Sequence, residues 1–202
     1  MVITAIAQAC INQGAVGLRL DTPAHIQAVR QALPTVPIIG LWKQTFPGST
    51  VYITPQFVHA EAVAAAGADI IALDCTLRPR PQGEDAAELI HQIKTRLGKP
   101  VMADVDTLES ALFASAAGAD LVGTTLFGYT EATQNLRPPG FDLLREILIH
   151  TDSPVICEGG IASPSMARRA LGMGAFAVVV GTAITGIDLQ VQSYCKAMRH
   201  PA

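Results

Sequence analysis

The sequence predicts an α/β protein with the (β/α)8 architecture of a TIM barrel. Two cassettes repeat along the chain, a Gly-Ala pair and a single Pro, and each is followed by an aliphatic run. Amphipathic stretches separate these runs. Continuously apolar strands that alternate with helices are typical of a parallel sheet covered by helices. A repeat of roughly 25 residues per strand and helix fits a barrel of 200 or more residues, and this chain has 202.

The strands are predicted at the seven aliphatic runs. The Gly-Ala pairs lead into VGLRL, DIIALD, DLVGTTL and FAVVVGTAI, and the prolines lead into IIGLWK, VMADVD and VICEGG. The spacing of apolar residues predicts helices between them. These helices are expected over residues 2–13, 59–66, 86–97, 108–117, 143–150 and 164–173.

The alternation of the two cassettes predicts that an eighth strand would precede the first helix. Each later Gly-Ala strand follows a Pro-led strand and a helix, whereas Gly14 follows only the helix over residues 2–13. Either the start is misassigned or the barrel is open. A doubly wound sheet, which needs no closure, is the alternative fold. Seven strands leave two edges that must be covered, so a homodimer formed through the gap is a further expectation.

Composition favours a globular protein, because half of the residues are hydrophobic and only 15% are charged. No linker divides the chain, so one barrel domain over residues 1–202, short at its amino terminus, is expected. A net charge of −3 without a Lys/Arg cluster argues against nucleic-acid and membrane-surface partners. No apolar run approaches the roughly 20 residues of a membrane helix. A cytoplasmic location is the expectation, since no secretory signal is evident.

The candidate functional residues are the polar residues that end the predicted strands, because barrel active sites lie at the carboxyl ends of the strands. Burying so many ionisable groups at one rim is costly unless they pair or act. The candidates are Arg19, Lys43, Asp74, Asp104, Asp106, Thr124, Thr125 and Glu158. The four cysteines are scattered without metal-ligand spacing, so neither a zinc site nor a disulfide framework is expected.

Two of these residues suit proton transfer. Lys43 among apolar walls is a candidate general base, although a solvated strand-end lysine is the alternative. Glu158 lies beside two glycines and is a candidate proton donor, with a structural salt bridge as its alternative. Asp104 is favoured over Asp106, because Asp106 precedes Thr107 and can instead cap the following helix.

Glycines after the last two predicted strands indicate a phosphate site. Gly159 and Gly160 follow one strand, and Gly181 with Thr182 follows the next. Barrels of this kind bind phosphate there, on backbone N–H groups and a short helix. No nucleotide-binding GxxxxGK[ST] or GxGxxG motif competes with them.

With these motifs in place, the chain resembles the N-acylmannosamine-6-phosphate 2-epimerase family across its length. The resemblance lies in VGLRL, VPIIGLWK, VYITP, GADIIALDCTLRPRP, VMADVDT, GADLVGTTLFGYT, VICEGGIASP and GAFAVVVGTAIT. It implies a barrel of the ribulose-phosphate-binding type. It also implies an isomerase that interconverts N-acetylmannosamine 6-phosphate and N-acetylglucosamine 6-phosphate at C2, in sialic-acid (N-acetylneuraminate) and aminosugar catabolism, with no metal or organic cofactor.

The resemblance also implies roles for individual residues. Lys43 would be the base and Glu158 the acid. Arg19, Asp104 and Thr124 would contact the substrate, a phosphorylated N-acyl aminosugar. Its phosphate would lie on the glycine motifs, at Gly159, Gly160, Gly181 and Thr182.

The chain departs from the family pattern in two places. The family places a Gln-bearing strand before the first helix, and no counterpart is present in the sequence. Gly186 stands where the family commonly has Arg, so part of the phosphate grip is expected to be missing. Two other functions stay open. One is a Schiff-base aldolase that uses Lys43 as nucleophile, and the other is an inactive barrel that binds a phosphosugar or a partner.

Overall fold

The computed structural model describes residues 2–199, and its sheet has seven parallel strands in sequence order. The strands are β1 (Leu18–Asp21), β2 (Ile38–Leu41), β3 (Ile70–Asp74), β4 (Val101–Asp104), β5 (Leu121–Gly123), β6 (Val155–Cys157) and β7 (Ala177–Val178). Each strand pairs with the next along the chain. The strand order never reverses, which excludes the doubly wound alternative. The seven predicted strands are all present.

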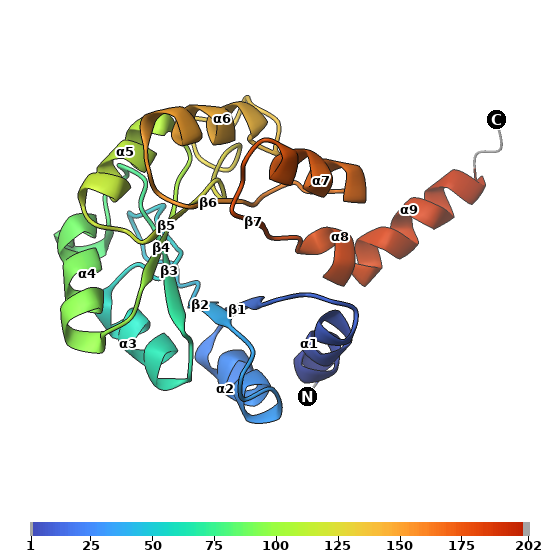
Figure 1. Cartoon of the computed structure of the whole chain (residues 1–202), viewed down its shortest axis with the longest axis horizontal. Coiled ribbons are helices and arrows are strands. Elements are labelled where there is room, and N and C mark those ends of the chain that lie inside the picture. Colours follow the sequence, from blue (N-terminus) through green and yellow to red (C-terminus); the bar gives the residue numbers. More distant parts are fainter. Residues whose placement is uncertain (1, 200–202) are drawn as a thin grey trace.

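Within residues 2–199 the sheet is accompanied by nine α-helices, most of which cover its outer face (Figure 1). They are α1 (Val2–Asn12), α2 (Pro23–Ala32), α3 (Phe57–Ala65), α4 (Ala86–Gln92), α5 (Leu108–Ala116), α6 (Phe141–His150), α7 (Pro164–Gly172), α8 (Thr182–Thr185) and α9 (Ile187–Arg199). A 3-10 turn, η1 (Pro81–Gly83), precedes α4, and a π-helical turn, η2 (Ile93–Leu97), continues it. The six predicted helices are confirmed.

The helix α2 was not predicted. Only Ile26 and Val29 of its ten residues are buried, so its apolar stripe is short. Its start is marked instead by Pro23, which suits the first turn of a helix because that position needs no N–H donor.

The sheet separates two apolar layers. The larger one fills the space between strands and helices and includes Ile26, Val63 and Ile71. The smaller one lies inside the curl of the sheet and includes Leu41, Met102 and Ile156. Since neighbouring residues of a strand point to opposite faces, β2 to β7 contribute to both layers, whereas β1 contributes apolar side chains only to the larger one.

The sheet curls strongly enough for distant strands to meet across its inner face. Arg19 on β1 lies 2.6 Å from Asp104 at the end of β4 and 3.1 Å from Glu158 after β6. Within residues 2–199, β1 and β7 pair with one neighbour each and form the two edges of the sheet (Figure 1). Dimerisation through these edges stays a prediction.

The last helix, α9, points away from the curled sheet (Figure 1). Together with α8 it exposes several large apolar side chains: Ile184, Ile187, Leu189, Val191, Tyr194 and Met198. None of the helices in residues 2–199, α9 included, combines the length and apolar character needed to cross a membrane.

Candidate active site

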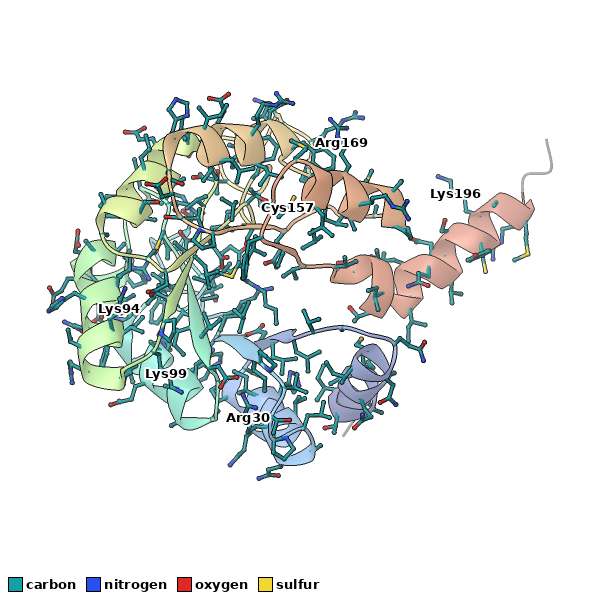
Figure 2. The ribbon with its side chains drawn as sticks, viewed as in Figure 1. Arg30, Lys94, Lys99, Cys157, Arg169 and Lys196 are labelled. Carbon is teal, nitrogen blue, oxygen red and sulfur yellow. The ribbon has the colours of Figure 1, made fainter. Side chains whose placement is uncertain are left out.

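Arg19 within β1 and residues at or just beyond the carboxyl ends of β4, β5 and β6 come together inside the curl. Asp104 pairs in register with Gly123 on β5, and Gly123 pairs with Ile156 on β6. Because side chains alternate along a strand, Thr125 and Glu158, two residues further on, continue this inner face. Figure 2 shows Cys157, which precedes Glu158, on β6 near the middle of the molecule.

Arg19 joins the two carboxyl groups of this cluster. Its guanidinium donates to both oxygens of Asp104, from Nη1 to Oδ1 at 3.0 Å and from Nη2 to Oδ2 at 2.6 Å. Nη1 also lies 3.1 Å from Oε2 of Glu158. Such two-pronged contacts fix the orientation of a carboxylate as well as its charge. The Asp104 side chain is fully buried, whereas 16% of the Glu158 side chain is exposed, so Glu158 is the more accessible acid.

Thr125 completes the cluster. Its hydroxyl lies 2.6 Å from Oδ1 of Asp104 and 3.3 Å from Oε2 of Glu158. From the sequence, Thr125 is predicted only as a polar residue at a strand end. The signal that identifies it is the register of β4 and β5, which places residue 125 on the same face as Asp104.

Thr124 faces the opposite side of the sheet, and its hydroxyl binds the main chain of Glu158. Its hydroxyl donates to the carbonyl oxygen of Glu158 at 2.9 Å and accepts from the N–H of Glu158 at 3.1 Å. The side chain is fully buried. In this structure, therefore, Thr124 positions the backbone that carries Glu158. The expected contact of Thr124 with substrate stays a prediction.

Burial raises the pKa of Glu158 to about 7. The positive charge of Arg19 opposes this shift, while the nearby Asp104 carboxylate adds to it. Desolvation disfavours the charged form of a carboxyl group, and a like charge acts in the same direction. Glu158 can therefore hold or release a proton near neutral pH, which suits an acid–base role.

This raised pKa predicts a pH-dependent cost to stability. A folded-state pKa above the unfolded value means that the native state binds more protons, so stability falls as pH rises between about 4.5 and 7. The shift corresponds to on the order of 3 kcal/mol. Glu158→Gln removes this cost, so the variant should gain stability relative to the wild type between pH 5 and pH 8.

Urea unfolding of both proteins at these two pH values measures this gain. Glu61→Gln, a change at an exposed glutamate on α3, is the matched control and should behave as the wild type does. A stability difference between Glu158→Gln and wild type that stays the same at pH 5 and pH 8 would contradict the raised pKa.

Lys43 lies just beyond β2, near the cluster. Its main-chain N–H donates to Oδ1 of Asp21 at 2.9 Å, and the residue forms a β-bridge with Ile53. The positive charge of Lys43 acts to lower the pKa of Glu158, against the larger effect of burial. In the sheet, β3, β4 and β5 separate the strands that carry them. The role of Lys43 as base stays a prediction.

Asp74 and Asp106, the other acidic candidates, are used in local networks. Asp74 accepts from Thr76 and pairs with Arg78 at 2.6 Å. Asp106 accepts from Ser110 at 2.8 Å and from Thr130 at 2.6 Å. Thr107, rather than Asp106, caps α5 by accepting from the N–H of Ser110. Within the described chain, no three His, Cys, Asp or Glu side chains are grouped to hold a metal ion.

The glycine motifs follow the neighbouring strands β6 and β7. Gly159 and Gly160 have φ values of 92° and 69°, a backbone conformation that side chains other than glycine rarely adopt. A Cβ on Gly160 would lie 2.5 Å from Cβ of Pro138, so close packing also requires glycine there. Gly181 precedes the first residue of α8, Thr182. The structure thus places both motifs beyond strand ends, and phosphate binding by them stays a prediction.

Known proteins share this chain's sequence and architecture. The family model described as "Putative N-acetylmannosamine-6-phosphate epimerase" matches residues 3–200. A Synechococcus elongatus protein named "Putative N-acetylmannosamine-6-phosphate 2-epimerase" is 66% identical over 98% of this chain and 85% of its own length. A Listeria welshimeri protein of the same name is 41% identical over 91% of this chain and 79% of its own.

A solved structure shows the same similarity in three dimensions. The N-acetylmannosamine-6-phosphate 2-epimerase from Clostridium perfringens matches with a TM-score of 0.91 at 34% identity, over 96% of this chain and 83% of that one. The family match covers nearly the whole chain, and the curled parallel sheet agrees with it. The chain therefore belongs to the N-acetylmannosamine-6-phosphate epimerase family.

Proposed function

We propose that this chain is an isomerase that interconverts N-acetylmannosamine 6-phosphate and N-acetylglucosamine 6-phosphate by proton transfer at C2. The observation that carries the proposal is Glu158, a partly accessible acid with a pKa of about 7 whose carboxyl group lies 3.1 Å from the guanidinium of Arg19. Inversion of a carbon centre by proton transfer needs two such groups, one on each face of the substrate. Family membership supplies the substrate class.

The chemistry starts from the open-chain form of the sugar. In that form C2 carries a hydrogen next to the C1 aldehyde, which makes the hydrogen acidic. Lys43 acts as the base that takes this proton, and the electron pair of the broken C–H bond moves into a C1–C2 enolate with its negative charge on the C1 oxygen. Glu158 then gives a proton to the opposite face of C2, the C1 carbonyl re-forms, and the configuration is inverted.

The cluster supplies orientation for this exchange. The guanidinium of Arg19 holds Asp104 and Glu158 in fixed relation, and Arg19 and Asp104 are the proposed contacts for the sugar hydroxyl groups. Gly159, Gly160, Gly181 and Thr182 are the proposed phosphate ligands, through main-chain N–H groups beyond β6 and β7. Two anchors of this kind fix C2 between the acid and the base.

A product assay combined with borohydride trapping tests this function against the aldolase alternative. The epimerase should convert N-acetylmannosamine 6-phosphate to its gluco epimer with no covalent labelling of the protein. An aldolase would form a Schiff base on Lys43, which borohydride traps as a permanent adduct. A labelled protein would therefore contradict the proposal, and binding without product from a folded sample would favour an inactive barrel.

A further inference from the structure

We propose that Thr125 is a positioning residue whose hydroxyl holds the carboxyl group of Glu158 against Asp104 and reorients as Glu158 gains or loses its proton. The inference rests on the proposed function, because it concerns the same proton transfer. The residue lies one position beyond Thr124, on the other face of the chain, and its hydroxyl contacts both acids of the cluster.

The hydroxyl of Thr125 faces two carboxyl groups but carries a single proton. A threonine hydroxyl has one hydrogen to donate. The contacts to Asp104 and Glu158, at 2.6 Å and 3.3 Å, therefore cannot both be hydrogen bonds donated by Thr125 at the same time. The shorter distance assigns the hydrogen to Asp104 in the state described. A lone pair of the hydroxyl oxygen is then free to face Oε2 of Glu158.

The charge on Glu158 decides which arrangement is stable. When Glu158 is protonated, it can donate to the hydroxyl of Thr125, which in turn donates to Asp104. When Glu158 has given its proton away, two carboxylates face the same hydroxyl, and Thr125 can turn its hydrogen toward Glu158. Arg19 continues to donate to Asp104 throughout, so Asp104 keeps donors when the hydroxyl turns. Thr125 contacts the acid in both protonation states, but it stabilises the ionised form more, because a hydrogen bond to a charged group is stronger than one between neutral groups.

Removal of the hydroxyl has one expected direction. Thr125 is a hydrogen-bond donor to the ionised form of Glu158, and this bond lowers the pKa of Glu158. Thr125→Val keeps a side chain of similar shape and removes this donor. The protonated form of Glu158 is then favoured, and the pKa of Glu158 rises.

The pH dependence of kcat/KM reports this change. The productive pair holds one proton, shared as neutral Lys43 with protonated Glu158 or as charged Lys43 with ionised Glu158. With two protons, neither group can act as a base, so the rate falls as pH falls through the pKa of Glu158. The pH profile of kcat/KM has the same shape for the manno-to-gluco and the gluco-to-manno reaction, since the ratio of the two kcat/KM values equals the equilibrium constant. In the free enzyme this acid limb reflects Glu158.

The experiment compares the acid limb of kcat/KM in wild type, Thr125→Val and Thr125→Ser. The limb of Thr125→Val should move up by about half a pH unit to one pH unit, the effect of one lost hydrogen bond. Thr125→Ser keeps the hydroxyl and should retain the wild-type limb. The substrate phosphate titrates near pH 6, but it does so equally for every variant. Thr95→Val, which alters an exposed threonine in η2, is the matched control.

A carbon-13 NMR titration of the Glu158 side chain gives a second readout that needs no turnover. Thr125→Val should raise the titration midpoint of this carboxyl group, and Thr125→Ala replaces it if Thr125→Val does not fold. Unchanged midpoints and limbs would overturn the inference, as would equal shifts in Thr125→Val and Thr125→Ser. If the midpoint moves while the wild type makes no epimer, the role of Thr125 stands and the proposed function fails.

Discussion

Lys43→Ala should leave the C2 hydrogen of N-acetylmannosamine 6-phosphate in place when the protein is incubated in deuterium oxide. In the proposed mechanism only Lys43 removes that hydrogen from the manno epimer. General-base catalysis contributes on the order of 10²- to 10⁴-fold to rate, so exchange and epimerisation should fall by at least the lower of these factors. Proton NMR follows both, through the loss of the C2 signal and the appearance of the gluco epimer.

Lys43→Ala should still catalyse C2 hydrogen exchange when the substrate is the gluco epimer. Glu158 is intact in Lys43→Ala and can remove and return the C2 proton of N-acetylglucosamine 6-phosphate, which should therefore exchange slowly without becoming the manno epimer. Lys99→Ala is the matched control, because Lys99 precedes β4 at the end opposite Asp104 and lies at the periphery (Figure 2). Exchange of the C2 hydrogen of the manno epimer at the wild-type rate by Lys43→Ala would contradict the assignment of Lys43 as the base.

Glu158→Gln should show the reverse pattern. Lys43 can still take the C2 proton of N-acetylmannosamine 6-phosphate and return a deuteron to the same face, so this epimer should exchange with retention. The rate at which the gluco epimer forms should fall by about 10²-fold or more, because no acid remains on the opposite face. The same NMR assay separates exchange from inversion.

The fold of Glu158→Gln is expected to stay intact. Glu158→Gln retains the shape of the side chain, and its amide oxygen can accept from Arg19 in place of Oε2. Its stability at neutral pH is expected to equal or exceed that of the wild type, so a loss of inversion cannot be assigned to unfolding. Epimer formation at the wild-type rate by this variant would remove Glu158 from the mechanism.

The positions of the strand ends were predictable from the sequence. Parallel strands that are buried on both faces leave continuous aliphatic runs, and a polar residue after such a run has few other places to lie than the carboxyl edge of the sheet. Lys43 and Glu158 were predicted in this way and lie beyond β2 and β6, whereas Arg19, predicted at a strand end, lies within β1. The contact of Arg19 with both acids was not predictable, since it joins β1, β4 and β6 and depends on how far the sheet curls.

The choice between neighbouring polar residues also needed the structure. Thr124 and Thr125 are chemically equivalent in the sequence, and only the pairing of Asp104 with Gly123 shows which of them faces inward. Asp104 and Asp106 present the same problem. Asp106 is bound by Thr130, which lies 24 residues further along the chain, and no local pattern indicates that partner.

The measurement that tests the account most directly is proton NMR of this chain with N-acetylmannosamine 6-phosphate in deuterium oxide. We expect the C2 signal to disappear while the gluco epimer accumulates with deuterium at C2, because Lys43 and Glu158 act on opposite faces of that carbon. A folded sample that neither exchanges the C2 hydrogen nor forms the epimer would contradict it.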